Sequence, residues 1–342
     1  MASNELDRLP VIAVTGPLGA GKTTVTNHLL RRVGARLGVV MNDFGAINVD
    51  AALVTGQVDE MAAISGGCLC CLPDSGGLDD ALAKLAHPRL RLDAVLVEAS
   101  GVADPVALAR LIRFSGVDRV RPSGVVEVVD AVNLDAADAG ADASNRYRAS
   151  TLVVITKTDL LEPATRDSVV ERIRDRVRRA NPDAEIVVAP HGSVDPQLVF
   201  DAAREEEPAD ELPLARLVRD DHAGAHHEHA HSASVVASGP VSPSALIDLL
   251  EHPPAGAYRL KGRVGVLTPG GVRGYAVNLV GGLIHVARMA APPRPAGELV
   301  AIGLRLDEAV AGARLHDVLA TPATRPDPAG LRRLQRYRRL SD

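Results

Sequence analysis

The sequence predicts an α/β fold, with a mostly parallel β-sheet flanked by helices, followed by a smaller α+β domain. Short apolar runs alternate with stretches of helical length, which is typical of βαβ units whose strands are buried on both faces. The 342 residues are 46% hydrophobic, which is enough for two domains with stable cores. We expect strands at Leu9–Thr15, Leu37–Met41, Ala94–Val97, Val125–Val129, Leu152–Ile155 and Ile186–Ala189, and helices over Lys22–Val33, Leu78–Leu85, Pro105–Phe114 and Thr165–Ala180.

Composition divides the chain into four parts. Residues 9–203 carry the alternating pattern, whereas residues 204–231 are charged and then rich in histidine, which is typical of a linker. A pattern of short strands and turns over residues 232–316 predicts the α+β domain. Residues 317–342 form a basic tail with six arginines, for which we favour a solvated terminal helix over a docking site. In the second domain we expect a helix near Pro243–Leu250 and strands at Arg263–Leu267, Tyr275–Val280 and Leu299–Arg305.

Composition also narrows the classes of partner. Aromatic residues make up 2% of the chain and tryptophan is absent, which disfavours a nucleic-acid platform built on base stacking. The net charge of −5 gives no electrostatic reason to expect a polyanionic partner. Residues 1–10 lack the pattern of a leader, and no apolar run has the length of a membrane span. We therefore expect a soluble, cytoplasmic protein without a nucleic-acid or membrane partner, whose oligomeric state is open.

A glycine-rich segment between the first strand and the first helix predicts a phosphate site. Residues 16–23 read GPLGAGKT and fit the pattern G-x-x-x-x-G-K-[ST]. Glycines let backbone N–H groups turn onto phosphate oxygens at the positive end of the following helix. Lys22 would reach the β and γ phosphates, and the Thr23 hydroxyl would bind Mg²⁺. The expected nucleotide-binding residues of this P-loop are Gly16, Gly19, Ala20, Gly21, Lys22 and Thr23.

An acidic residue ends a later apolar run, in the order that a P-loop fold requires. Glu98 follows Val95–Val97, and Gly101 lies three residues further on. A carboxylate at this position can hold the Mg²⁺ shell, and a glycine N–H can meet the γ-phosphate. We therefore expect Thr23 and Glu98 at Mg²⁺.

The segment Thr156–Asp159 reads TKTD and favours guanine over adenine. The Asp159 carboxylate can accept both N1–H and N2–H of guanine, while the Lys157 stem can lie along the base. Adenine lacks both donors in that arrangement. The usual first residue of such a motif is Asn, and Thr156 loses its amide contact. The alternative is an ordinary turn between a strand and a helix.

Three cysteines in four residues predict a metal site. Cys68, Cys70 and Cys71 stand in the sequence GGCLCC, too few and too close for a disulfide framework. Thiolates select soft or borderline ions, so Zn²⁺ comes first, followed by Co²⁺ and Cu(I). A closed structural zinc site would normally offer four ligands, whereas three sulfurs and one exchangeable position suit a site that releases its ion.

A histidine tract in the linker is a second, weaker metal candidate. Five of the eleven histidines fall within ten residues, and neutral imidazoles on a tether would collect Zn²⁺, Co²⁺ or Ni²⁺ and exchange them quickly. The alternative is low-complexity drift in a solvated linker. The tract comprises His222, His226, His227, His229 and His231.

Together these motifs resemble one protein family. The segments GPLGAGKTT, MNDFG, GGCLCC, VEASGVADP and TKTDL, in this order and at these separations, resemble the CobW branch of the metal-handling GTPases related to HypB and UreG. The resemblance continues through residues 181–196 and an R-x-K-G element at Arg259–Gly262 to about residue 316. It therefore spans nearly the whole chain.

The resemblance implies a cytoplasmic GTPase that delivers a transition metal to a client protein or cofactor pathway. It adds Thr24 to the phosphate and Mg²⁺ positions and Asp43, which stands for the family's Glu, to the metal loop. It also implies that His191 lies beside the base. The matching positions of the family assign the catalytic role to Lys22, Glu98 and Gly101. They assign the guanine motif to Thr156, Lys157 and Asp159, and the metal loop to Cys68, Cys70 and Cys71.

The expected mechanism is a switch. The thiol loop lies in the chain between residues 42–45 and Glu98–Gly101, where γ-phosphate and Mg²⁺ contacts order switch loops, so GTP would assemble the thiolate site and hydrolysis would release the ion. No intrinsic catalytic Gln or arginine finger is evident in the sequence, which predicts slow turnover. Two alternatives stay open: a P-loop ATPase or kinase with structural cysteines, and a metal reservoir or sensor with a regulatory nucleotide site.

Overall fold

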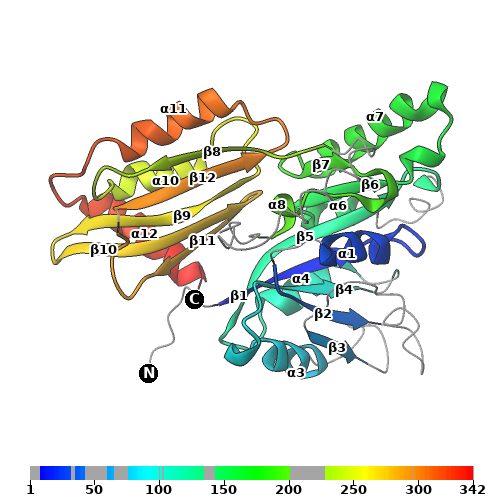
Figure 1. The fold of residues 1–342 in the computed structure, drawn as a ribbon, viewed down its shortest axis with the longest axis horizontal. Helices are drawn as coiled ribbons and strands as arrows, with labels where there is room; N and C mark the ends of the chain where they lie inside the picture. Colours follow the sequence, from blue (N-terminus) through cyan, green and yellow to red (C-terminus); the bar gives the residue numbers. More distant parts are fainter. Residues whose placement is uncertain are drawn as a thin grey trace, which may run out of the picture. The chain divides into compact units, whose positions relative to one another are not determined.

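The computed structural model describes residues 8–31, 35–42, 60–64, 76–99, 101, 104–134, 143–200, 228–294 and 296–341. The chain forms two compact units, one spanning residues 9–228 and the other residues 229–342 together with the first eight. Figure 1 shows the elements of each unit. None of the helices within the described ranges is both long and apolar enough to cross a membrane.

The first unit is built on a seven-stranded sheet in which every pairing is parallel, in the order β3-β2-β4-β1-β5-β6-β7 (Figure 1). This confirms the predicted α/β class. The side chains of the central strands β1, β4 and β6 are buried almost throughout, as expected for strands covered on both faces. The strands are β1 Leu9–Thr15, β2 Leu37–Asn42, β3 Glu60–Ile64, β4 Ala94–Glu98, β5 Val120–Asp130, β6 Leu152–Thr156 and β7 Glu185–Val188.

Two strands differ from the sequence prediction. We did not expect β3, because its sequence EMAAI begins with a charge and lacks a β-branched run. We expected β5 only from Val125, because Pro122 and Gly124 interrupt the apolar pattern. The strand continues through them because β5 carries one extra residue between the pairs Val11–Pro122 and Ala13–Val125, a bulge that accommodates the interruption.

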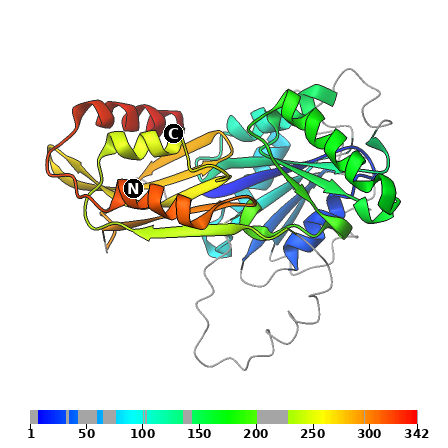
Figure 2. The same ribbon diagram turned by 90° about the horizontal axis from the view of Figure 1, so that it is seen from above.

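Helices flank both faces of this sheet (Figure 2). Side chains of α3 and α4 pack with Val11 and Val97 in one cluster, and those of α6 and α7 pack with Val153 and Ile155 in another. The strand register places both clusters on the same face of the sheet, and α1 lies on the other face. Proline at the first turn starts α4 and α7, where its missing N–H costs no hydrogen bond. The helices are α1 Lys22–Leu30, α3 Gly76–Leu85, α4 Pro105–Arg113, α6 Ala143–Ala149, α7 Pro163–Ala180 and the short α8 Pro196–Val199.

The second unit is a five-stranded antiparallel sheet in the order β11-β10-β9-β12-β8, with three helices on one face (Figure 1). The edge strands β8 and β11 were not predicted from the sequence. The expected basic tail contains a helix, α12, whose Leu334 is fully buried in the core, so the helix is docked and not wholly solvated. The elements are β8 His231–Val236, α10 Pro243–Glu251, β9 Arg259–Thr268, β10 Gly271–Val280, β11 Leu283–Arg288, β12 Gly297–Gly303, α11 Glu308–Leu319 and α12 Pro328–Ser341.

Candidate functional site

The glycine-rich loop between β1 and α1 has the backbone of a phosphate-binding loop. Gly16, Gly19 and Gly21 have φ angles of +143°, +77° and +98°, which favour glycine. A Cβ on Gly16 would also collide with the carbonyl oxygen of Val128 on β5. No acidic residue lies in the first turn of α1, so the positive end of this helix faces the loop without a neutralising side chain. These features suit an anion at the N-terminus of α1.

The Lys22 side chain turns back over this loop. It is 8% exposed, and its Nζ donates to the carbonyl oxygens of Gly16 at 3.0 Å and Pro17 at 3.1 Å. The Lys22 ammonium group therefore lies at the P-loop, where the sequence predicts contacts with phosphate.

Glu98 joins β4 to the P-loop. Both of its oxygens accept from hydroxyls of α1, Oε1 from Thr23 at 2.7 Å and Oε2 from Thr26 at 2.8 Å, and Glu98 is only 4% exposed. The parallel register brings Glu98 opposite Val14 of β1, directly before the loop. The sequence analysis did not identify Thr26; its position one helical turn after the motif threonine was the available signal.

Gly101 approaches the P-loop backbone closely. A Cβ built on Gly101 would lie 2.5 Å from the backbone N and 2.6 Å from the Cα of Leu18. Only glycine fits this contact without displacing one of the two segments. The structure thus brings together the glycine loop, Thr23, Glu98 and Gly101.

The guanine-motif segment contacts the P-loop from β6. The Thr156 hydroxyl donates to the carbonyl oxygens of Ala20 at 2.7 Å and Val129 at 3.1 Å. Lys157 has a φ of +58°, and its Nζ donates to the carbonyl oxygen of Gly19 at 2.6 Å. Although threonine lacks the amide of the usual asparagine, its hydroxyl still bonds the P-loop backbone.

Asp130 at the end of β5 holds Lys157 in place, and the sequence analysis did not identify it. Its Oδ2 lies 2.7 Å from Lys157 Nζ, and its oxygens also accept from the backbone N–H groups of Val132 and Asn133 and from Asn133 Nδ2. Burial raises the pKa of Asp130, but the hydrogen bonds from Lys157, Asn133 and Val132 outweigh it, so the pKa lies below its ordinary value of 3.8. The available signal was an acid ending the strand beside the guanine motif.

Asp159 and His191 lie together beyond the ends of β6 and β7. The His191 backbone N–H donates to Asp159 Oδ1 at 3.4 Å, and the His191 Nδ1 is 3.4 Å from Asp159 Oδ2. His191 has a φ of +54° and a side chain that is 74% exposed. The next residue, Gly192, lies against Thr24 of α1, since an added Cβ would be 3.0 Å from the Thr24 methyl group. The predicted base site and phosphate site therefore adjoin.

All residues of the predicted cysteine metal site and three histidines of the predicted tract lie outside the described residues. They are Asp43, Cys68, Cys70, Cys71, His222, His226 and His227. His229 is described, and His231 is not part of a linker but begins β8, where its Nδ1 lies 3.3 Å from Glu308 Oε1. Within the described ranges no group of three His, Cys, Asp or Glu residues is placed to hold a metal ion.

The strands that lead into the cysteine and Asp43 segments are nonetheless in register with the strand of Glu98. Asn42 of β2 pairs with Ile64 of β3, and Met41 pairs with Glu98 of β4. β2 and β3 therefore end on the same side of the sheet as β4, where Glu98 meets α1. The segments that contain Asp43 and the cysteines follow these two strands in the sequence.

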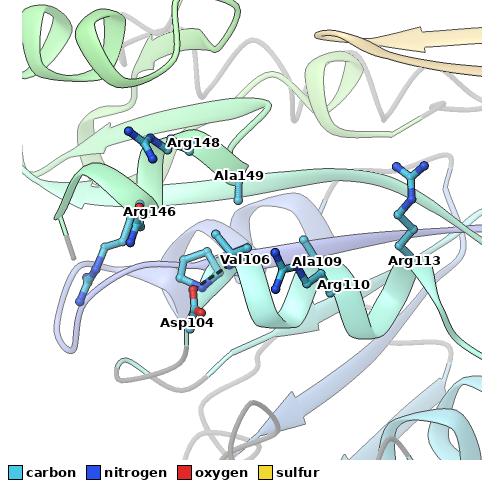
Figure 3. Close-up of a pocket in the computed structure, with 10 residues that line it drawn as sticks. Asp104, Val106, Ala109, Arg110, Arg113, Arg146, Arg148 and Ala149 are labelled. Carbon is cyan, nitrogen blue, oxygen red and sulfur yellow. Dashed lines mark hydrogen bonds between the residues drawn. The ribbon is translucent and has the colours of Figure 1, made fainter.

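A separate cavity of about 640 Å³ lies between α4 and α6 (Figure 3). Four arginines line it, and its acidic residue Asp104 accepts from the Val106 N–H at 2.9 Å and thereby caps α4. No P-loop residue belongs to its described lining. The arginines are Arg110 and Arg113 on α4 and Arg146 and Arg148 on α6.

Two family models match this chain. The model of the CobW/HypB/UreG nucleotide-binding domain matches residues 10–188, and that of the cobalamin synthesis protein cobW C-terminal domain matches residues 230–319.

Named relatives are zinc chaperones and a metalloprotein activator. The zinc chaperone CobW of Sinorhizobium sp. is 27% identical over 90% of this chain and 96% of its own length. The zinc chaperone YjiA of Escherichia coli is 30% identical over 57% of this chain and 62% of its own length. The zinc-regulated GTPase metalloprotein activator 1 of Schizosaccharomyces pombe is 30% identical over 56% of this chain and 48% of its own length. The matched part of this chain thus covers less than two thirds of the length of YjiA and of the metalloprotein activator.

Solved structures resemble it more distantly. The crystal structure of Zn(II)-bound YjiA GTPase from E. coli is 23% identical, with a TM-score of 0.43, over 91% of this chain and 98% of that one. HypB from Helicobacter pylori in complex with nickel is 19% identical, with a TM-score of 0.42, over 56% of this chain and 82% of that one.

Proposed function

Since this chain belongs to the CobW/HypB/UreG family, we propose that it is a GTP-hydrolysing metallochaperone that binds a transition metal, Zn²⁺ first and Co²⁺ as the alternative, and delivers it to a client under nucleotide control. The observation that carries the proposal is the register of three strands. β4 holds Glu98 against α1. Its neighbour β2 leads directly into the segment with Asp43, and β3, which pairs with β2, leads into the segment with the three cysteines. Adjacent strands lie about 4.8 Å apart, so the Asp43 segment starts one strand spacing from the strand of Glu98 and the cysteine segment starts two spacings from it.

The donors around Thr23 fit Mg²⁺ bound with GTP. A hydroxyl and a carboxylate within 2.7 Å of each other are hard oxygen ligands of the kind that this ion prefers. Thr23 and Glu98 would hold it, and it would neutralise charge on the β and γ phosphates.

The remaining nucleotide contacts come from four segments of the chain. Gly16, Gly19, Ala20 and Gly21 would turn their N–H groups to the phosphates, and Lys22 and Thr24 would add side-chain and backbone donors. The Gly101 N–H would meet the γ-phosphate. Asp159 would select guanine, the Lys157 stem would lie along the base, and His191 would lie beside it. Thr156 would hold this segment against the P-loop.

The metal would be held by thiolates and released with the switch. Cys68, Cys70 and Cys71 would provide sulfur ligands, Asp43 would add a carboxylate, and the histidines of residues 222–231 would bind the metal more weakly. Thiolates need a reducing compartment, which is consistent with the cytoplasm. We propose a client metalloprotein or a metal-cofactor pathway enzyme as the recipient.

A Zn²⁺ titration of the reduced protein in three states tests this function: without nucleotide, with GDP and Mg²⁺, and with a non-hydrolysable GTP analogue and Mg²⁺. We expect the analogue state to bind Zn²⁺ about tenfold tighter, which corresponds to about 1.4 kcal/mol of coupling. Cys68→Ser should abolish the difference. Equal affinity in all three states would exclude nucleotide control and favour a reservoir, and ATP competing as well as GTP would favour the ATPase or kinase alternative.

A further inference from the structure

We propose that the cavity between α4 and α6 is a docking site for an acidic segment of a partner protein, in which apolar side chains stand between Asp and Glu residues. The cavity measures about 640 Å³ and lies within the first unit of the chain. Its described lining includes neither the P-loop nor the residues of the guanine motif, so the proposal does not depend on the proposed GTPase function.

The middle of the cavity is apolar. Pro105, Val106 and Ala109 of α4 and Ala149 of α6 line it, are buried or half-buried, and are called the floor below. Figure 3 shows Ala149 directed toward Val106 and Ala109. Two of these side chains end at Cβ, so the two helices leave space above them. Because burial of apolar surface is favourable, this space suits an apolar side chain of a ligand.

Four arginines surround the floor, Arg110 and Arg113 from α4 and Arg146 and Arg148 from α6 (Figure 3). Within the part of the chain that the structure describes, none of their guanidinium groups has a hydrogen bond or an ion pair. Asp104, the acidic residue of the described lining, caps α4 by accepting from the Val106 N–H at 2.9 Å. The paired N–H donors of each guanidinium group are therefore available to a carboxylate.

The helix ends explain why these positive charges are tolerated without acidic partners. Arg110 and Arg113 lie in the last turn of α4, and Arg146 and Arg148 lie in the last turn of α6. The negative end of a helix dipole stabilises cations at this position. The cluster can thus exist in the free protein and still bind an anionic ligand.

The positive charge of the cavity is a local feature of a chain whose net charge is −5. The nearest buried strand, β5, carries Glu127 on the same face of the sheet, between Val125 and Val129. Glu127 is 1% exposed, accepts from the Thr15 hydroxyl at 2.6 Å, and is not part of the described lining. A ligand in the cavity would therefore meet the four arginines and Asp104 directly.

The positions of the charges favour a polypeptide over a small polyanion. Arg113 and Arg146 lie at opposite ends of the cavity, with the floor between them (Figure 3). An oligophosphate needs donors that converge on one place, and the side chains of the floor donate no hydrogen bonds. A peptide can place an apolar side chain on the floor and carboxylates on both sides of it.

An exposed aromatic residue extends this surface along α4. Phe114 is 77% exposed, although the chain has only three phenylalanines. It stands four residues after Arg110, which places it one helical turn further along the same side of α4. Aromatic residues and arginines are enriched in protein–protein interfaces and in the residues that dominate their affinity. This combination therefore supports a protein as the partner.

Fluorescence anisotropy with three labelled octapeptides tests the proposal. The full-length protein is first saturated with GDP and Mg²⁺, so that no peptide binds at the P-loop. We expect about one peptide of sequence EEDLLEED to bind per chain. EEDSSEED, which keeps the charge but lacks the apolar side chains, should bind at least about fivefold more weakly, and the uncharged QQNLLQQN should not bind measurably.

A matched pair of variants locates the site. The double variant Arg110→Gln, Arg148→Gln removes one guanidinium group from each helix and should weaken binding of EEDLLEED at least about fivefold. The control variant Arg172→Gln, Arg178→Gln removes the same charge from exposed positions of α7 in the same unit. Neither of its residues lines the cavity, so it should bind the peptide normally.

Four outcomes would overturn the proposal. Equal binding of EEDSSEED would exclude a role for the floor, and equal binding by the Arg110→Gln, Arg148→Gln variant, when circular dichroism shows it folded, would exclude this cavity. Displacement of the peptide by a lower concentration of tripolyphosphate would indicate a small polyanion as the ligand. At least about tenfold tighter peptide binding after Glu205, Glu206 and Glu207 are replaced by Gln would indicate the acidic segment of this chain itself as the occupant.

Failure of GDP to bind in the first step would contradict the proposed GTPase function alone, because the comparison of peptides and variants can be repeated without nucleotide.

Discussion

Lys157 and Asp130 form an ion pair with 2.7 Å between Nζ and Oδ2, and the same ammonium group donates to the carbonyl oxygen of Gly19 at 2.6 Å. One side chain therefore joins the ends of β5 and β6 to the P-loop. Because the Lys157 stem is expected to lie under the base, its position links base recognition to phosphate recognition.

Asp130→Asn should weaken binding of both GTP and GDP by about tenfold, because a hydrogen bond between charged groups becomes one to a neutral amide. Fluorescent-nucleotide titration measures the affinity. Asp183→Asn, at an exposed position beyond α7, is the matched control and should bind normally. Unchanged affinity in Asp130→Asn would show that Lys157 is positioned without its partner.

The same pair predicts a pH dependence of stability. Burial raises the pKa of Asp130 but its hydrogen bonds lower it further, so the folded-state pKa is below the unfolded one. The stabilisation is then fully present above the unfolded pKa and is lost as the pH falls through the folded-state value. The difference in unfolding free energy between the native chain and Asp130→Asn should be constant near neutral pH and shrink below about pH 4. Urea denaturation at several pH values measures this difference in unfolding free energy. A difference that stays constant below about pH 4 would contradict the prediction.

Thr156→Val should lower both stability and nucleotide affinity. The substitution keeps the shape but removes the hydroxyl that bonds the Ala20 and Val129 carbonyl oxygens, which costs about 1–3 kcal/mol for a buried group left unpaired. Denaturant unfolding and nucleotide titration measure the two effects. Thr321→Val, at an exposed position, should change neither.

Gly101→Ala should impair nucleotide binding, because the added Cβ would overlap the backbone of Leu18 and displace the P-loop or the segment after β4. Gly312→Ala on α11 is the matched control. No atom lies within 4 Å of the position of its Cβ, so this substitution should stabilise the chain by about 0.5–1 kcal/mol. Normal GTP affinity in Gly101→Ala would show that the close approach is not needed for binding.

The elements that carry the P-loop were predictable because their signals are local. An apolar run followed by glycines and a lysine predicts β1, the loop and α1 without reference to the rest of the chain. β3 was missed because EMAAI lacks β-branched residues at all but its last position, and its place is decided by pairing with β2.

The contacts made by Asp130 and Thr26 were not predictable for a different reason. Asp130 meets Lys157 across 27 residues, and Thr26 meets Glu98 across 72. Such contacts depend on which strands become neighbours, and the motif sequences do not contain that information. The hydrogen bond from Thr156 to Ala20 likewise depends on β6 ending beside the P-loop.

Glu98→Gln tests whether the β4 carboxylate connects the nucleotide to the metal. The amide can accept one of the two hydroxyl hydrogen bonds but brings no charge to Mg²⁺, so we expect GTP to bind while hydrolysis falls by at least about tenfold. The difference in Zn²⁺ affinity between the GTP-analogue and GDP states should disappear at the same time, because both effects pass through one group. Glu127→Gln removes another buried carboxylate, which accepts from Thr15 at 2.6 Å on the other side of β1, and controls for loss of stability. If Glu98→Gln lost hydrolysis but kept the nucleotide-dependent Zn²⁺ affinity, the signal to the thiol loop would have to come from the 42–45 segment instead.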